Sequence, residues 1–167
     1  MVYLDRAEEK DAARCLEILA DGRAFQREQG FVQWGDNYPN ADTVRSDIEK
    51  NIAYILRVDG DAAGYLCIDF NGDPEYATLE GEWGNDEPYA VMHRLAISAQ
   101  FRGIGLADAA FSLVEQLCRE RGVGTIRVDT DFPNKRMQHI VKKNGFIERG
   151  IVTLTNGRRI AYDKIFC

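Results

Sequence analysis

The stretch "HRLAISAQFRGIGLADAAF", residues 93–111, passes from an apolar strand-like run through two closely spaced glycines into an apolar helix-like run. The first turn of a helix has unpaired N–H groups and a positive dipole end, which favour phosphate. Gly103 and Gly105 lack side chains that would keep an anion away, and Arg102 adds a positive charge. The stretch therefore predicts an anion-binding turn, although a plain turn that uses glycine for its backbone freedom would look the same.

The chain has 167 residues, of which 45% are hydrophobic and 29% are charged, and a net charge of −6. This length and composition predict one globular domain over residues 1–167. The acidic balance argues against a nucleic-acid partner, which normally requires a basic face, and is weakly consistent with a cationic substrate. The N-terminus is too charged for a secretory signal and no apolar run reaches membrane length, so we expect no membrane association and a cytoplasmic location.

The cysteines do not have the spacing of a metal or redox site, which fits a reduced, cytoplasmic protein. We therefore expect no metal, three buried thiols and one exposed terminal thiol. In chain order they are Cys15, Cys67, Cys118 and Cys167.

The hydrophobic periodicity predicts a mixed, mostly antiparallel sheet of six or seven strands with helices on both faces, an α/β (α+β) fold. A strand, a helix and a strand near residues 89–129 imply one parallel pair joined by a right-handed crossover. Asp42 or Thr43 is the expected N-cap of the second helix. The segment 71–88 is rich in turn residues and too polar for the core. Strands are predicted at 1–7, 53–58, 62–70, 89–97, 125–130, 146–154 and 158–166, and helices at 10–30, 41–52, 105–122 and 134–145.

A dinucleotide-binding turn is the main alternative for the glycine pair. That fingerprint requires a third glycine where this chain has Asp108, although Asp129 stands at the distance of the acidic ribose ligand. The turn would also have to follow the first strand of the domain, whereas here about a hundred residues precede it. These differences disfavour a nicotinamide- or flavin-dependent oxidoreductase.

The segment from Ile97 to Ala107, with Arg102, Gly105 and Ala107 at its defining positions, resembles the acetyl-CoA motif of the GCN5-related N-acetyltransferase (GNAT) superfamily. Asn134, followed by Gly145-Phe146, resembles a second element of that family, and the expected order of elements matches its fold. The longer pattern is similar to a bacterial subgroup of uncharacterised members.

The resemblance implies acetyl-CoA as co-substrate and assigns its contacts. Backbone groups of the strand before the turn would pair with the pantetheine arm, amides of the turn would hold the pyrophosphate, and an asparagine would bond the pantetheine. The same asparagine is also a plausible helix N-cap. The cofactor residues so implied are Leu95, Ala96, Ile97, Arg102, Gly103, Ile104, Gly105, Leu106, Ala107, Asp108 and Asn134.

The implied reaction is direct transfer of the acetyl group to a primary amine of a small molecule or peptide. His93 is our candidate base, because alternation places it with Leu95 and Ile97 on one face and its unperturbed pKa is about 6.5. It also resembles the histidine that relays protons in the serotonin-acetylating branch of the family. A water chain, or Glu82 acting through water, is the alternative base, and the backbone N–H of Leu95 would stabilise the oxyanion. Arg94 points to the opposite face and is expected to be structural.

Many family members have a tyrosine seven residues after the asparagine, where this chain has Val141. Either no dedicated acid is used, or a residue such as Tyr89 or Tyr162 takes its place; His139 lies about half a turn away on the helix. Because valine cannot donate a proton, an alternative function is a catalytically weak sensor module that binds acyl-CoA.

Aromatic residues near carboxylates could bind the acceptor amine through cation–π contacts, although core packing would also explain the tryptophans. The resemblance further suggests a homodimer. The candidate acceptor residues are Trp34, Tyr38, Trp83 and Tyr89.

Overall fold

The protein is described by a computed structural model that covers residues 1–166, and the predicted exposed thiol of Cys167 lies outside the described residues. The contacts within the chain define two compact units. Unit 1 comprises residues 1–68 and 93–113, and unit 2 comprises residues 69–92 and the chain from Val114 onward. The single domain expected over residues 1–167 stays a prediction.

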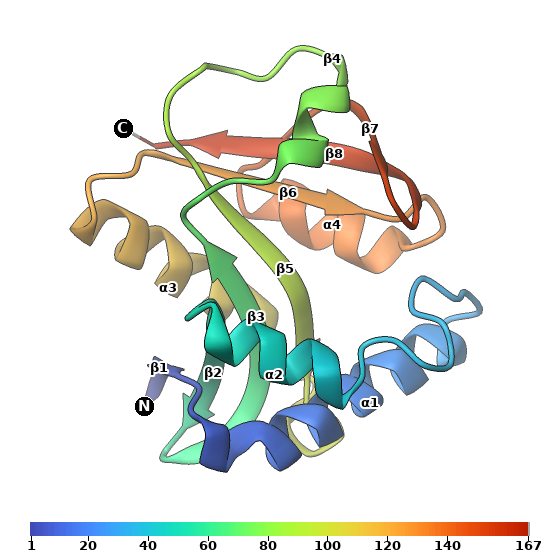
Figure 1. Ribbon diagram of the computed structural model, residues 1–167, viewed down its shortest axis with the longest axis vertical. Helices are drawn as coiled ribbons and strands as arrows, with labels where there is room; N and C mark the ends of the chain where they lie inside the picture. Colours follow the sequence, from blue (N-terminus) through green and yellow to red (C-terminus); the bar gives the residue numbers. More distant parts are fainter. Residues whose placement is uncertain (167) are drawn as a thin grey trace. The chain divides into compact units, whose positions relative to one another are not determined.

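The helices and strands follow the order expected from the sequence, with one additional short strand, β4 (Figure 1). The strands are β1 (Val2–Arg6), β2 (Ala53–Val58), β3 (Asp61–Asp69), β4 (Glu80–Gly81), β5 (Ala90–Ile97), β6 (Thr125–Thr130), β7 (Ile147–Leu154) and β8 (Gly157–Ile165). The α-helices are α1 (Ala12–Glu28), α2 (Ala41–Glu49), α3 (Leu106–Glu120) and α4 (Lys135–Lys143), and short 3-10 turns are η1 (Glu9–Asp11), η2 (Pro74–Thr78) and η3 (Ala99–Phe101).

The strand order is β1-β2-β3-β5-β6-β8-β7-β4. The ladders β1–β2, β2–β3, β6–β8, β7–β8 and β4–β7 are antiparallel, whereas β5 and β6 are parallel. The mixed, mostly antiparallel sheet predicted from the sequence is therefore confirmed, with eight strands in place of the expected six or seven.

Unit 1 packs helices on both faces of its strands. On one face, Ile18 and Leu19 of α1 and Val44 of α2 pack with Ile55 of β2, and all four side chains are buried. Figure 1 shows α1 and α2 on the same side of these strands. On the other face, strand residues including Leu56 pack with the first turns of α3. Apolar side chains on alternate faces of the strands therefore account for both layers.

The N-cap of helix α2 is Asn40, two residues before Asp42 and three before Thr43. The side chain of Asn40 accepts a hydrogen bond from the backbone N–H of Thr43, and the Thr43 hydroxyl accepts one from the backbone N–H of Asn40. This reciprocal pair satisfies two N–H groups that would otherwise lack partners. The N-cap prediction at Asp42 or Thr43 is therefore wrong, because Thr43 serves as the third residue of the helix.

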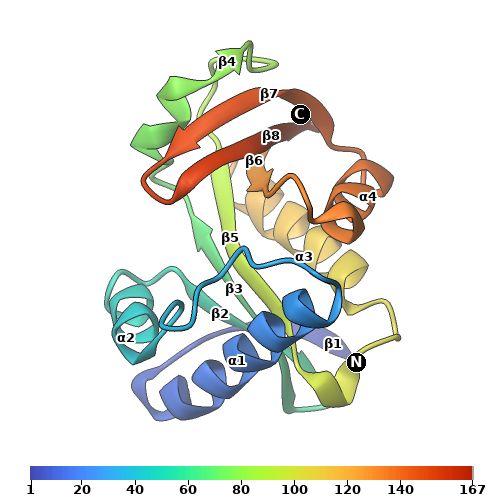
Figure 2. The same ribbon diagram turned by 90° about the vertical axis from the view of Figure 1, so that its right-hand side faces the viewer.

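Unit 2 is built on the hairpin of β7 and β8, which Figure 2 shows joined by a tight turn. The strand β8 also pairs with β6, and β6 pairs in parallel with β5 at Ala90 and Val91. Lys164 of β8 donates to Glu115 of α3 at 2.6 Å. This bond ties the last turns of α3 to the sheet of unit 2.

The segment 71–88 contributes to the core of unit 2, so the expectation that it is too polar for the core is wrong. Tyr76 is 1% exposed and packs with Val91, Val152 and Ala161. Its hydroxyl donates to the Asp129 carboxylate at 2.6 Å, which provides the partner that a buried hydroxyl requires. One deeply buried aromatic residue thus anchors an otherwise polar segment.

Candidate active site

The glycine turn has the backbone geometry of an open anion cradle. Gly103 and Gly105 have φ values of +82° and +79°, a conformation that side chains disfavour. A Cβ atom placed on either glycine would meet no atom within 4 Å, so the space beside the backbone is open. The exposed Ile104 lies between them. A phosphate could therefore approach this backbone closely.

The first turn of α3 follows this open backbone directly. The N–H of Ala109, in the first turn of α3, donates to the carbonyl of Gly105 at 3.1 Å. The amides of Leu106 and Ala107 precede that bond, and the first amides of a helix have no carbonyl four residues earlier within the helix. Their N–H groups and the helix dipole favour an anion at this position.

Arg102 directs its guanidinium to α1. Its Nη2 donates to the carbonyl of Asp21 at 2.7 Å, its Nη1 lies 3.7 Å from a Glu28 carboxylate oxygen, and the group stacks on the ring of Phe25 at 4.0 Å. In this conformation Arg102 anchors the turn through its side chain, and it does not provide the donor charge that we expected at the glycines.

His93 is half-buried in β5, immediately before a break in the regular strand. Arg94 has a φ of +53°, in the left-handed region. A left-handed residue interrupts the alternation of a strand, so alternation alone does not place His93 on the same face as Leu95 and Ile97, and that placement stays a prediction. Proximity along the chain still places His93 next to the residues that lead into the turn.

The three residues after Arg94 return to regular packing. Leu95 and Ile97 are half-buried and pack with Leu106 and Ala110 of α3. Ala96 is buried on the opposite side, where a Cβ placed on Gly22 of α1 would lie 2.8 Å from the Ala96 Cβ. Because α1 approaches β5 closely at Gly22, the strand before the glycine turn is held on both sides.

The two acceptor candidates in unit 1 have different environments. Trp34 is 7% exposed and packs in the apolar core, so its ring does not lie at the surface. Its backbone N–H donates to the Gln26 side chain at 3.0 Å. Tyr38 is half-buried, and its hydroxyl accepts a hydrogen bond from Arg94 Nη1 at 3.0 Å. Of these two aromatic residues, Tyr38 remains accessible and lies next to β5.

The acceptor candidates in unit 2 already surround a cation of the chain itself. The guanidinium of Arg127 lies 4.2 Å from the Trp83 ring centre and 3.8 Å from the Tyr89 ring centre. The Trp83 indole also donates to the Tyr76 carbonyl at 3.1 Å. The ring faces that we expected to bind an ammonium group are thus used internally, and Glu82, exposed after β4, stays a predicted base.

Asn134 is the N-cap of α4, because its side chain accepts from the backbone N–H of Met137 at 3.1 Å. This confirms the structural role that the sequence suggested, and its role toward a cofactor stays a prediction. Val141 is 1% exposed, whereas His139 is exposed on the same helix. The position of the family tyrosine is therefore an interior position of unit 2.

The two tyrosines that could replace a missing acid differ in their partners. The Tyr89 hydroxyl donates weakly to the Asp73 carbonyl at 3.5 Å and accepts from the Asp73 N–H at 3.3 Å. The Tyr162 hydroxyl is buried and has no hydrogen-bond partner among residues 1–166, and burial raises its pKa to about 12. Tyr162 therefore keeps a protonated hydroxyl at neutral pH.

The main feature that the sequence interpretation missed is Asp47. This residue is 2% exposed and forms an ion pair with Arg94. Its position was a usable signal, because Val44, Asp47 and Ile48 have the spacing of one helical face, and a carboxylate on an apolar face needs a partner. Distance in sequence hid that partner, since 46 residues separate Asp47 from Arg94.

The described part of the chain brings together no group of three His, Cys, Asp or Glu side chains able to hold a metal ion. Among residues 1–166, no helix combines the length and the apolar character needed to cross a membrane. Cys15, Cys67 and Cys118 are free thiols and buried, as the sequence predicts.

Comparison with known proteins identifies similar sequences and folds. The sequence model of the Acetyltransferase (GNAT) family matches residues 14–146. An acetyltransferase of the GNAT family from Streptococcus agalactiae 2603 is 33% identical, with a TM-score of 0.87 over 98% of this chain and 95% of that protein. One from Listeria monocytogenes 4b F2365 is 22% identical, with a TM-score of 0.77 over 99% and 95% of the two chains.

A more distant neighbour has been solved with ligands. The aminoglycoside acetyltransferase AAC(6')-Ib, in complex with ribostamycin and coenzyme A, is 23% identical with a TM-score of 0.72, over 98% of this chain and 93% of that one. Among curated proteins, the long tail fiber protein Gp37 of Enterobacteria phage K3 is 26% identical over 138 residues, 81% of this chain. The chain spans about 11% of the length of that curated relative.

Proposed function

This chain belongs to the Acetyltransferase (GNAT) family, and on that premise we propose that it transfers the acetyl group of acetyl-CoA directly to a primary amine. The observation that carries the proposal is the open backbone at Gly103 and Gly105, directly before the first turn of α3. Amides of residues 103–108 would hold the pyrophosphate. Backbone groups of Leu95, Ala96 and Ile97 would pair with the pantetheine arm, and Asn134 would bond it.

Acyl transfer requires a neutral amine and a stabilised oxyanion. The amine nitrogen attacks the thioester carbon, the C–N bond forms, the C–S bond breaks, and the amine proton leaves to a base. We assign the base to His93 or to a water chain, with Glu82 as an alternative that acts through water. The backbone N–H of Leu95 would donate to the carbonyl oxygen as negative charge develops on it.

The leaving thiolate needs little help from an acid, since the pKa of a thiol is about 8.5. Val141 cannot donate a proton to it. Tyr162 is the better of the two alternatives, because its buried hydroxyl has no partner among residues 1–166, whereas Tyr89 contacts Asp73 and Arg127. A hydrogen bond from Tyr162 to the sulfur, rather than full proton transfer, suits a hydroxyl whose pKa is raised to about 12.

We propose a small polar amine as acceptor. Tyr38 lies beside β5 and is accessible, while Trp34, Trp83 and Tyr89 are occupied by packing or by Arg127. The net charge of −6 favours the approach of a cationic molecule over distance. The aminoglycoside bound to AAC(6')-Ib makes such polyamines the first class to test. A peptide amine and a homodimer stay predictions.

The decisive experiment is a thiol-release assay with acetyl-CoA against aminoglycosides, other polyamines, amino acids and peptide N-termini. We expect amine-dependent release of CoA and an acetylated amine of matching mass. The control is the N-acetylated form of each active amine, which has no free amine and should give only background hydrolysis. Calorimetric binding of acetyl-CoA without turnover over the whole panel would instead support the sensor module that the sequence left open.

A further inference from the structure

The left-handed conformation of Arg94 is unusual for its position. Among described residues other than glycine, positive φ values occur at Asn51, Asp59 and Arg94. Asn51 and Asp59 lie in turns and are residue types that tolerate this conformation, whereas Arg94 lies within β5. A strained conformation inside a strand persists only where the surroundings hold it.

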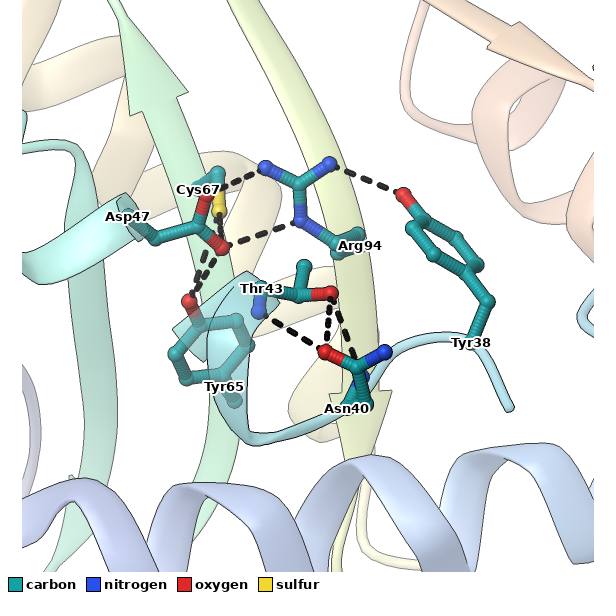
Figure 3. A network of polar contacts seen from close by, with 7 residues as sticks. All are labelled: Tyr38, Asn40, Thr43, Asp47, Tyr65, Cys67 and Arg94. Atoms are coloured by element: carbon teal, nitrogen blue, oxygen red, sulfur yellow. Dashed lines mark hydrogen bonds and ion pairs between the residues drawn. The ribbon is translucent and has the colours of Figure 1, made fainter. Parts of the chain in front are cut away.

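A buried carboxylate holds the Arg94 side chain at two points. Arg94 Nε donates to Asp47 Oδ2 at 3.0 Å and Nη2 donates to Oδ1 at 2.5 Å (Figure 3). The side chains of Asp47 and Arg94 are 4% and 17% exposed. A two-point contact of this kind fixes the plane of the guanidinium as well as its position.

Two further donors complete the coordination of the Asp47 carboxylate. The Tyr65 hydroxyl donates to Oδ2 at 2.6 Å and the Cys67 thiol donates to the same oxygen at 3.0 Å. Burial raises the pKa of Cys67 to about 12 and the pKa of Tyr65 well above its ordinary value. Both groups therefore stay protonated at neutral pH and act as donors, which stabilises the buried charge.

The same guanidinium connects β5 to the loop before α2. Arg94 Nη1 donates to the Tyr38 hydroxyl at 3.0 Å, and Figure 3 shows Tyr38 on the side of Arg94 away from Asp47. The helix α2, which carries Asp47, starts at the capping pair of Asn40 and Thr43. One side chain thus ties together the loop, α2 and the irregular point of β5.

We propose that Asp47, acting through Arg94, is a positioning residue that holds the left-handed point of β5 and thereby fixes the direction of the Leu95 N–H and the His93 side chain. This inference rests on the proposed function, because it concerns the two groups assigned to the oxyanion and to the base. A left-handed residue takes the next peptide group out of the regular alternation of a strand, so the N–H of Leu95 depends on the conformation of Arg94. Buried ion pairs often add little net stability, which makes a role in conformational specificity the better explanation.

The test compares Asp47→Asn with Asp163→Asn, a matched control in unit 2. Asp163 is also buried and pairs with an arginine, Arg149, at 2.8 Å. We expect both variants to lose stability to denaturant. Only Asp47→Asn should lower kcat, by at least 10-fold, with the dissociation constant of acetyl-CoA changed less than 3-fold. Equal kcat values in the two folded variants would overturn the inference.

Arg94→Lys provides the second variant if Asp47→Asn does not fold. Lysine keeps the positive charge but cannot make the two-point contact, so we expect a loss of kcat of the same sign. Amide hydrogen exchange and ¹⁵N shifts of residues 93–96 give a readout that is independent of turnover. We expect changes at Leu95 in both variants and none in Asp163→Asn, and unchanged Leu95 signals would overturn the inference.

The outcomes separate this inference from the proposed function. If the wild-type chain releases no CoA with any amine, the proposed function fails together with the catalytic part of the inference, while the Leu95 amide still tests whether Asp47 holds the strand. If the wild-type chain turns over and Asp47→Asn matches Asp163→Asn, the inference alone fails.

Discussion

Replacing Gly105 by alanine tests the cofactor site at its most specific point. At a φ of +79° an added Cβ costs about 1–2 kcal/mol of backbone strain. The methyl group would also enter the open space beside the turn, where the phosphates are expected to lie. Gly105→Ala should therefore lower both the stability of the fold and the affinity for acetyl-CoA.

The size of the affinity loss follows from the contacts at stake. A hydrogen bond to a charged group contributes about 1.5–3 kcal/mol, and one blocked amide would therefore weaken binding by roughly 10- to 150-fold. Isothermal titration calorimetry with acetyl-CoA measures this directly. Turnover should recover at saturating acetyl-CoA, because the change affects binding of the cofactor rather than the chemistry.

Gly122 offers a matched control for backbone strain. It has a φ of +72°, it also has no atom within 4 Å of an added Cβ, and it follows the C-terminal end of α3. Gly122→Ala should lose a similar amount of stability and keep the affinity for acetyl-CoA. An equal loss of affinity in both variants, or no loss in Gly105→Ala, would refute the assignment of the turn.

Three further predictions concern the base, the core of unit 2 and the response to acid. His93→Ala should lower kcat by roughly 10²- to 10⁴-fold with little change in acetyl-CoA affinity, and the exposed His139→Ala should keep full turnover; a fully active His93→Ala enzyme would reject the base. Tyr76→Phe removes the hydrogen bond that the buried Tyr76 hydroxyl donates to the Asp129 carboxylate and should lower the free energy of urea unfolding by about 1–3 kcal/mol, and a loss near zero would contradict the proposed anchor. The hydrogen bond from Lys164 of β8 lowers the pKa of Glu115 in the folded chain. The stabilisation of the fold by this bond is therefore complete above the ordinary pKa of a glutamate, about 4.3, and is lost as the pH falls through the lowered pKa. The stability difference between the wild-type chain and Glu115→Gln should therefore shrink below about pH 4, and a difference independent of pH would exclude this pair as its source.

Local patterns were sufficient to predict most of the fold. The order of the elements, the hairpins and the parallel pair of β5 and β6 joined by α3 follow from hydrophobic periodicity and turn residues. Both signals come from residues that are close together in the sequence. The strand β4 was missed because a strand of two residues is too short to show hydrophobic alternation. The burial of Tyr76 was missed because a polar average over the segment 71–88 conceals one aromatic anchor.

The site was predicted unevenly for a related reason. The turn at Gly103 and Gly105 is contiguous in sequence, so its open geometry could be anticipated. The Asp47–Arg94 pair joins positions 47 residues apart, and the partners of Arg102 and Arg127 are likewise remote. A long cationic side chain can turn to several partners, and sequence alone does not select among them.

The two tryptophans of the chain lie one in each unit, and this distribution makes them separate optical reporters. Trp34 is enclosed in the apolar core of unit 1, whereas Trp83 faces a guanidinium in unit 2, so their emission should differ in wavelength and intensity. Variants with a single tryptophan, Trp34→Phe and Trp83→Phe, would each follow one unit during denaturation. Coincident transitions would mean that the two units unfold as one cooperative body, and separate transitions would mean that each has its own stability.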